Sequence, residues 1–234
     1  MTDQPAGPAA APKVGAVDFG DLRRVTPVAG SFGFERGRPV DRYYIERFLE
    51  EQASAIAGRV LEIGDATYTR QFGGSRVTRS EVIHASDGVP GVTIVADLAD
   101  APHIPAGTFN CVICTQTLQL IYDVRGAVST LHRILAPGGV LLATFPGISQ
   151  TDDRAWEPSW YWSFTPVSAR RLFGDTFGPS GVEVTVHGNV LTAICFLHGI
   201  VTEELRPEEL AYTDPSFPFL ITVRAAKNEQ GAPL

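Results

Sequence analysis

The stretch RVLEIGDATYTRQFGG, residues 59–74, decides the fold of this chain. It begins with a short apolar run typical of a buried strand, and a turn follows at Gly64. Turns that bind a dinucleotide carry further glycines, because backbone N–H groups must approach the pyrophosphate. Asp65, Ala66 and Thr67 stand in their place here. The stretch predicts either a ligand-binding turn of unusual composition or an ordinary strand-to-helix turn.

The segments around this strand alternate in the manner of an α/β protein. Apolar runs without strict alternation predict further parallel strands at 80–85, 92–98, 108–116 and 139–147. Apolar residues at a 3.6-residue spacing predict helices at 38–58, 124–135, 165–177 and 191–205. Two alternating segments, 182–190 and 219–225, close the sheet as antiparallel strands. We therefore expect a Rossmann-like, mostly parallel seven-stranded sheet with an antiparallel edge strand.

Composition sets the surroundings in which the chain works. We expect a single domain at 16–226 between disordered tails at 1–15 and 227–234, which hold little apolar surface. The net charge is −7, and no basic run suits nucleic acid or anionic lipid. Three cysteines and a start without a secretory pattern indicate a cytoplasmic protein.

Polar residues gather where the predicted strands end. In doubly wound sheets ligands bind at that edge. The residues that follow the strands are Glu62, Gly64, Asp65, Ser86, Asp87, Asp97, Thr115, Gln116 and Gln150. They include no lysine and too few glycines for a phosphate site. Carboxylates and amides suit S-adenosylmethionine better, since it offers ribose hydroxyls, an adenine amine and a cationic sulfonium.

The segments VLEIGD, IVADLADAPHIPAGTFNCVICTQTL and LHRILAPGGVLLATFPG resemble the core of class I S-adenosylmethionine-dependent methyltransferases. Further segments, among them EIGDATYTRQFGG and GNVLTAICFLHGIVTEEL, resemble a bacterial methyltransferase-domain subfamily often found beside glycosyltransferases or fused to them. In that subfamily this form of the turn is usual. The resemblance implies the class I methyltransferase fold and S-adenosylmethionine as cofactor.

The resemblance also implies which residues bind the cofactor. Glu62 and Gly64 would shape the turn around the methionine part, and Asp97 with Leu98 would contact the adenine. The segment 85–87 stands where the ribose-binding acid usually lies. The complete set of implied cofactor-binding residues is Tyr43, Glu62, Gly64, Asp65, Thr67, Ser86, Asp87, Asp97, Leu98, Thr115 and Gln116.

The candidate residues for the acceptor and for catalysis lie largely after the fifth predicted strand. The substrate-binding candidates are Gln150, Trp156, Trp160 and Trp162. The tryptophans would form either a stacking wall for a sugar or aromatic acceptor, or a cap on the core. Asp153 is a candidate general base, with a solvated loop acid as the alternative. His103, in a loop near the sheet edge, is the second candidate base.

Cys111 and Cys114 form a CxxC spacing that can indicate a metal or redox site. Both lie inside a predicted strand, where residues three apart point to opposite faces. We therefore interpret them as buried packing residues and expect no metal site.

These patterns predict a transferase that moves a methyl group from S-adenosylmethionine to a small-molecule acceptor. The association with glycosyltransferases favours a hydroxyl of a sugar or glycosylated metabolite. Two alternatives stay open: a non-catalytic partner protein with this fold, and an enzyme of this fold that catalyses another reaction, such as cyclisation. The sequence leaves open whether the chain is a monomer or a homodimer.

Overall fold

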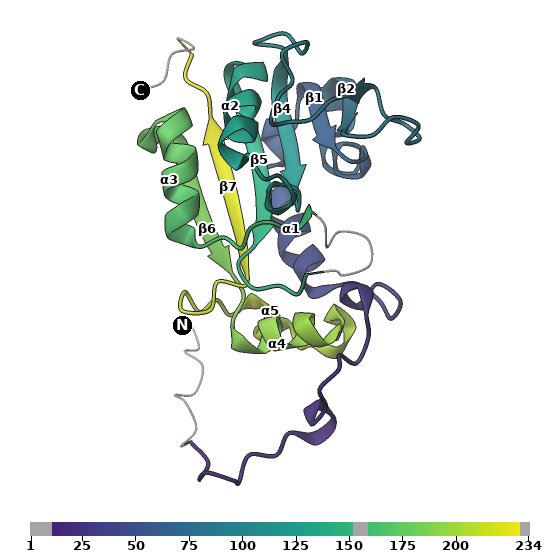
Figure 1. Ribbon diagram of the computed structural model, residues 1–234, viewed down its shortest axis with the longest axis vertical. Helices are drawn as coiled ribbons and strands as arrows, with labels where there is room; N and C mark the ends of the chain where they lie inside the picture. The colour runs from purple at the N-terminus through teal and green to yellow at the C-terminus, as the bar shows by residue number, and fades with distance from the viewer. Residues whose placement is uncertain (1–10, 152–158, 230–234) are drawn as a thin grey trace.

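The computed structural model describes residues 11–151 and 159–229. In these ranges one seven-stranded sheet has the order β3-β2-β1-β4-β5-β7-β6 (Figure 1). The strands are β1 (Gly58–Ile63), β2 (Val77–His84), β3 (Ile94–Val95), β4 (Phe109–Thr115), β5 (Leu135–Pro146), β6 (Val182–His187) and β7 (Leu220–Ala226). Strands β1 to β5 pair in parallel, while β7 runs antiparallel to both β5 and β6. The predicted mostly parallel sheet is confirmed, with its antiparallel strand next to the β6 edge.

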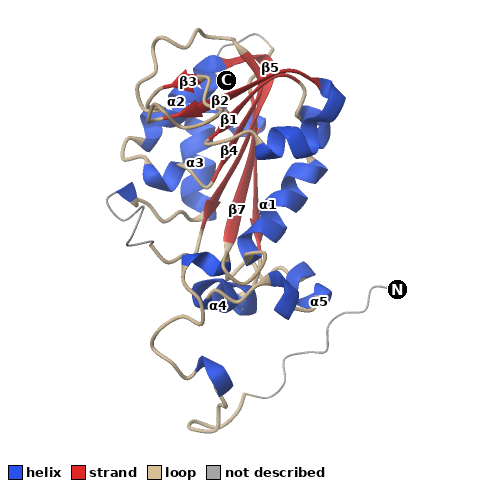
Figure 2. Cartoon of the chain, turned by 90° about the vertical axis from the view of Figure 1, so that its right-hand side faces the viewer, coloured by secondary structure: helices blue, strands red, loops and turns tan. Residues whose placement is uncertain are grey.

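Helices cover both faces of the sheet. They are α1 (Val40–Glu51), α2 (Val124–Ile134), α3 (Pro166–Phe177), α4 (Val190–His198) and α5 (Pro207–Ala211). Figure 2 shows α1 on one side of the sheet and α2 with α3 on the other. Two separate clusters of buried apolar side chains correspond to these two faces. Parallel strands with both faces covered explain the continuous apolar runs in the sequence.

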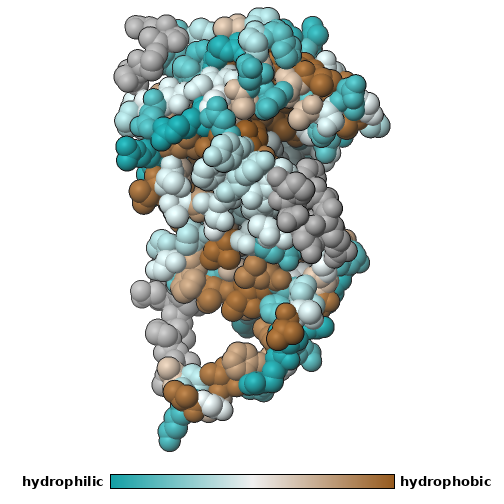
Figure 3. Space-filling view, viewed as in Figure 1, coloured by the Kyte–Doolittle hydropathy of each residue, from teal (hydrophilic) through white to brown (hydrophobic). Residues whose placement is uncertain are grey.

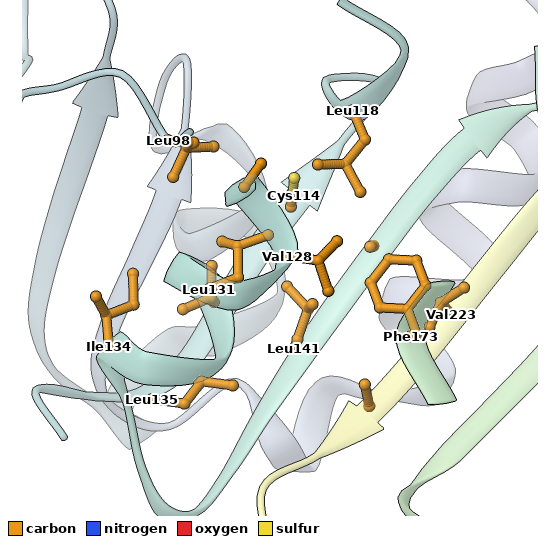
Figure 4. Close-up of a cluster of buried hydrophobic side chains, with 14 of the residues drawn as sticks. Leu98, Cys114, Leu118, Val128, Leu131, Ile134, Leu135, Leu141, Phe173 and Val223 are labelled. Atoms are coloured by element: carbon orange, nitrogen blue, oxygen red, sulfur yellow. The ribbon is translucent and has the colours of Figure 1, made fainter. Parts of the chain in front are cut away.

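The cluster under α2 and α3 shows why these segments are helical. Val128, Leu131 and Phe173 point from the two helices onto Leu141 of β5 (Figure 4). The side chain of Asp123 caps α2 by accepting a hydrogen bond from the Gly126 N–H at 2.9 Å. Such a cap satisfies one of the free N–H groups of the first helical turn.

The two cysteines of the CxxC spacing lie on opposite faces of β4, as predicted. Cys114 belongs to the cluster under α2 and α3, and Cys111 belongs to the cluster under α1 and α4. Burial raises the pKa of each thiol to about 12. In the described residues no group of His, Cys, Asp and Glu side chains is placed to hold a metal ion.

The predicted strand at 92–98 is much shorter in the structure. Only Ile94 and Val95 pair with β2. The carboxylate of Asp97 accepts a hydrogen bond from the Ala99 N–H at 2.8 Å, and the Asp97 carbonyl accepts one from the Asp100 N–H at 3.1 Å. This local turn competes with strand pairing, so apolar composition overestimated the strand.

The C-terminal side of the sheet extends past Ala226. The side chain of Lys227 is buried, and its Nζ donates hydrogen bonds to the carbonyls of His132 at 2.9 Å and Leu135 at 2.8 Å. These carbonyls lie at the end of α2, where a positive charge is favourable. Sequence composition placed Lys227 in the tail at 227–234, whereas its side chain joins the last strand to α2.

Apolar side chains are also exposed over α4 (Figure 3). Val190, Leu191, Ile194 and Leu197 are each more than a third exposed. None of the helices in the described ranges is long and apolar enough to cross a membrane.

Candidate functional site

A cavity of about 610 Å³ opens at the carboxyl ends of β1, β2, β3 and β4, and we call it the rim cavity. Its volume lies within the roughly 300–1,000 Å³ of small-molecule sites. Most of the predicted cofactor-binding residues line it: Glu62, Gly64, Asp65, Thr67, Ser86, Asp97, Leu98, Thr115 and Gln116. The structure thus brings together residues from four strand ends at the edge where the sequence placed them.

The turn after β1 is held by Glu62. This carboxylate is 2% exposed and accepts hydrogen bonds from the backbone N–H groups of Tyr68 at 3.0 Å and Thr69 at 2.7 Å. Burial raises the pKa of Glu62 above its ordinary value, while the hydrogen bonds from Thr69 and Tyr68 act in the opposite direction. The Glu62 carboxylate therefore holds the start of the short helix at Thr69–Gly73 in place through these two hydrogen bonds.

The missing glycines of the turn have a simple structural explanation. Gly64 has a φ of +93°, a backbone conformation that favours glycine. Asp65, Ala66 and Thr67 have no positive φ, so this form of the turn needs no glycine there. The Asp65 carboxylate accepts a hydrogen bond from the Thr67 N–H at 2.6 Å and closes the turn. A Cβ on Gly64 would meet nothing within 4 Å, so a ligand can approach this backbone closely.

The end of β2 contributes a residue that the sequence reasoning missed. His84 lines the rim cavity, and its Nδ1 accepts a hydrogen bond from the Ser86 N–H at 2.9 Å. The same Nδ1 lies 3.2 Å from the Ser86 carbonyl, so the two contacts belong to different tautomers, and Nε2 is a donor in the one whose Nδ1 accepts from the Ser86 N–H. Its position as the last residue of β2 was the available signal, because the rim rule applies to strand ends.

Several predicted residues lie away from the rim cavity. Tyr43 packs edge-on against Tyr44 and lines no part of the rim cavity, whereas its neighbour Arg42 does. One helical residue rotates a side chain by about 100°, so neighbours on α1 face different ways. Asp87 and His103 are exposed and line no part of the cavity, so their positions give a cofactor contact or a base no support.

The predicted substrate residues divide in a similar way. Trp160 lines a second cavity, described below, while Trp162 stacks on Tyr122 with ring centroids 6.0 Å apart. The Trp162 Nε1 donates a hydrogen bond to the Ile121 carbonyl at 2.9 Å, as a residue that caps the fold would. Gln150 lines neither cavity. The remaining candidates, Asp153 and Trp156, lie outside the described residues.

The second cavity, which we call the side cavity, has a volume of about 320 Å³. It shares four wall residues with the rim cavity, namely Phe34, Arg42, Gln116 and Leu120, so the two cavities adjoin. Aromatic rings form another wall: the ring of Phe32 lies 5.3 Å from that of Phe196 and 6.4 Å from that of Trp160. The arrangement can hold two ligands side by side.

Comparison with known proteins agrees with this geometry. Residues 58–143 match the family model described as a methyltransferase domain. No curated protein matches the sequence. The fold is similar to that of a SAM-dependent methyltransferase from Archaeoglobus fulgidus, with a TM-score of 0.53 and 12% identity over 80% of this chain and 94% of that one.

Two further solved structures have the same fold. The N-methyltransferase NodS from Bradyrhizobium japonicum, in complex with S-adenosyl-L-homocysteine, gives a TM-score of 0.52 and 13% identity over 86% of this chain and 94% of that one. The YcgJ protein from Bacillus subtilis gives 0.51 and 15% over 80% of this chain and 99% of that one. These likenesses confirm the predicted Rossmann-like methyltransferase fold.

Proposed function

We propose that this chain, whose residues 58–143 match a methyltransferase domain, binds S-adenosylmethionine in the rim cavity and a small-molecule acceptor in the side cavity. The observation that carries the proposal is the wall that the two cavities share at Gln116 and Leu120. The bound cofactor supplies an electrophilic methyl group. The chain's own residues then hold the acceptor beside it and exclude water, which accounts for much of the catalysis.

The residues of the rim cavity fit the parts of this cofactor. The open backbone at Gly64 accommodates the methionine part, which needs close approach rather than a large pocket. Asp97 and the buried Leu98, just beyond β3, suit the adenine, whose amine is a donor and whose ring faces are apolar. The imidazole of His84 and the side chain of Ser86, at the end of β2, suit the ribose hydroxyls, which both donate and accept hydrogen bonds.

The charges of the rim cavity also fit. Its described lining includes the carboxyl side chains of Glu62, Asp65 and Asp97, the guanidinium of Arg42 and no lysine, so acidic side chains outnumber the cation. A sulfonium cation is favoured by such a lining, whereas a polyphosphate is not. This fit distinguishes the rim cavity from the glycine-rich phosphate sites that related sheets use.

For the acceptor we propose a hydroxyl compound, namely a sugar or a glycosylated metabolite. The flat rings of Phe32 and Trp160 in the side cavity support this choice, because the C–H faces of sugar rings pack well on aromatic faces. A cavity with aromatic walls and a few polar groups is typical of a small-molecule site. It is too small for a folded macromolecule.

Titration calorimetry with S-adenosylmethionine and S-adenosylhomocysteine tests the cofactor assignment. We expect both to bind, and we expect Asp97→Ala to weaken binding about tenfold, equivalent to one hydrogen bond of about 1.4 kcal/mol. Asp87→Ala is the matched control, since Asp87 lies outside the rim cavity. A wild-type chain that binds neither nucleoside would show a non-catalytic partner. Binding without methylation of any acceptor would indicate a different reaction, such as cyclisation.

A further inference from the structure

The side cavity contains a buried carboxyl group of which one oxygen has no hydrogen-bond partner among the described residues. Asp41, in the first turn of α1, is 6% exposed, and its Oδ1 has no partner among the described residues. The rest of the carboxylate is held by hydrogen bonds from the backbone N–H groups of Arg42 and Asp41, and Oδ2 lies 4.0 Å from Arg42 Nη1. Buried polar atoms are normally hydrogen-bonded, because leaving one without a partner is unfavourable. A buried carboxylate oxygen without a partner on a cavity wall is therefore a candidate for ligand binding.

A second buried polar atom in the same cavity is also unpaired. Gln119 is 2% exposed, and its Nε2 donates a hydrogen bond to Gln116 Oε1 at 3.3 Å. Its own Oε1 has no partner among the described residues. Asp41 and Gln119 thus present two unpaired acceptor atoms on the walls of one cavity. Such a cavity is complementary to a ligand that carries donors.

The backbone around the side cavity is strained. Among the described residues, the non-glycine residues with positive φ are Ser31 at 45°, Phe32 at 59° and Gln116 at 49°, and all of them line this cavity. Such a conformation is unfavourable for a residue with a Cβ and persists where the surrounding packing enforces it. For Ser31 and Phe32 this packing is the close approach of the neighbouring Gly33 to Gly199, since a Cβ on Gly33 would lie 2.7 Å from the Gly199 carbonyl oxygen. Strain concentrated on one cavity points to a functional role for its shape.

The charge beside the cavity selects among donor ligands. Arg42 lines both cavities, with its guanidinium 5.5 Å from the ring centroid of Phe34. Arg42 and the cofactor's sulfonium would oppose the attraction of Asp41 for an ammonium acceptor, whereas a neutral hydroxyl carries no charge for them to repel. Burial raises the pKa of Asp41 above its ordinary value, while Arg42 acts in the opposite direction. A carboxyl that is more basic than usual suits proton abstraction.

We propose that the side cavity holds a neutral hydroxyl acceptor through Asp41 and Gln119, and that Asp41 is the general base. The inference rests on the proposed function. In the transfer the hydroxyl proton passes to Asp41 Oδ1, the oxygen bonds to the methyl carbon, and the carbon–sulfur bond breaks with its electron pair left on sulfur. The proton then returns to solvent.

Asp41→Asn tests the role of the base, with Glu50→Gln on the exposed face of the same helix as the matched control. The probes are methyl glycosides of glucose, galactose and mannose and their 2-amino-2-deoxy counterparts. We expect methylation on oxygen, and a loss of about 10²–10⁴-fold in kcat for Asp41→Asn alone. Affinity for S-adenosylhomocysteine should stay at the wild-type value in both variants.

A second measurement needs no turnover. In the complex with S-adenosylhomocysteine, the hydroxyl probes should shift the indole N–H resonance of Trp160. Burial makes the ionised form of Asp41 unfavourable, so Asp41→Asn should raise the free energy of unfolding at pH 7. This gain over the wild type should disappear below the ordinary carboxyl pKa, where Asp41 is protonated in both the folded and the unfolded chain. A variant that had lost structure in general would instead have a lower free energy of unfolding.

The inference fails if methylation occurs on nitrogen, or if Asp41→Asn methylates hydroxyls at the wild-type rate. It also fails if no hydroxyl probe is methylated and none shifts the Trp160 resonance. Each of these results leaves cofactor binding in the rim cavity intact. A chain that does not bind the cofactor would overturn the proposed function itself, and the inference with it.

Discussion

Replacement of Glu62 by glutamine should weaken cofactor binding by disordering the turn after β1. The carboxylate accepts two backbone hydrogen bonds, from Tyr68 at 3.0 Å and Thr69 at 2.7 Å. A glutamine amide has one acceptor oxygen, so its NH₂ group would face the second N–H, donor against donor. At least one charge-assisted hydrogen bond is lost, and such a bond contributes about 1.5–3 kcal/mol.

If that loss falls on the turn, affinity for S-adenosylhomocysteine should decrease about ten- to hundredfold. Global stability should change less, because the substitution also removes a buried carboxyl whose ionisation burial disfavours. Titration calorimetry measures the first quantity, and urea unfolding followed by circular dichroism measures the second.

Glu81→Gln is the matched control. Glu81 is 3% exposed and pairs with Arg59 at 3.0 Å and Arg79 at 2.6 Å, away from the rim cavity. This variant should lower stability while leaving cofactor affinity unchanged. The reasoning is refuted if Glu62→Gln binds as tightly as the wild type, or if Glu81→Gln weakens binding to the same degree.

Three further predictions concern residues outside the rim cavity. The thiols of Cys111, Cys114 and Cys195 are buried, and burial raises the pKa of each well above its ordinary value. Ellman's reagent should therefore label them only in denaturant, and rapid labelling of the native protein would contradict this. Lys227→Met should lower the free energy of unfolding by about 1–3 kcal/mol, because carbonyls at the end of α2 lose their hydrogen-bond donor. An unchanged midpoint of urea unfolding would show that the Lys227 side chain does not stabilise the fold. Burial lowers the pKa of His187 to about 4, so the free energy of unfolding should decrease as the pH falls from about 6.5 toward 4. The variant His187→Gln should lose less stability over this range. If it loses as much as the wild type, His187 is not the cause.

The sequence identified the parts of the site that depend on strand ends. Apolar runs located β1, β4 and β5 in the sequence. Parallel pairing brings the carboxyl ends of these strands to one edge of the sheet, independently of the conformation of the loops. The rim residues Gly64, Asp97 and Gln116 could therefore be placed together without coordinates. The turn after β1 could not be resolved in this way, because its lack of glycine depends on φ values that composition does not reveal.

The tertiary structure alone decided where an acceptor can bind. Asp41, Phe32 and Gln119 lie in separate segments of the sequence, and only the packing of residues 29–34 on the end of α4 closes them around one cavity. No periodicity marks Asp41, since an acid in the first turn of a helix is ordinarily a solvated residue favoured by the helix dipole. The sequence favoured His103 and Asp153 as bases because it shows residue types, whereas burial and a missing partner, the properties that distinguish Asp41, arise from long-range contacts.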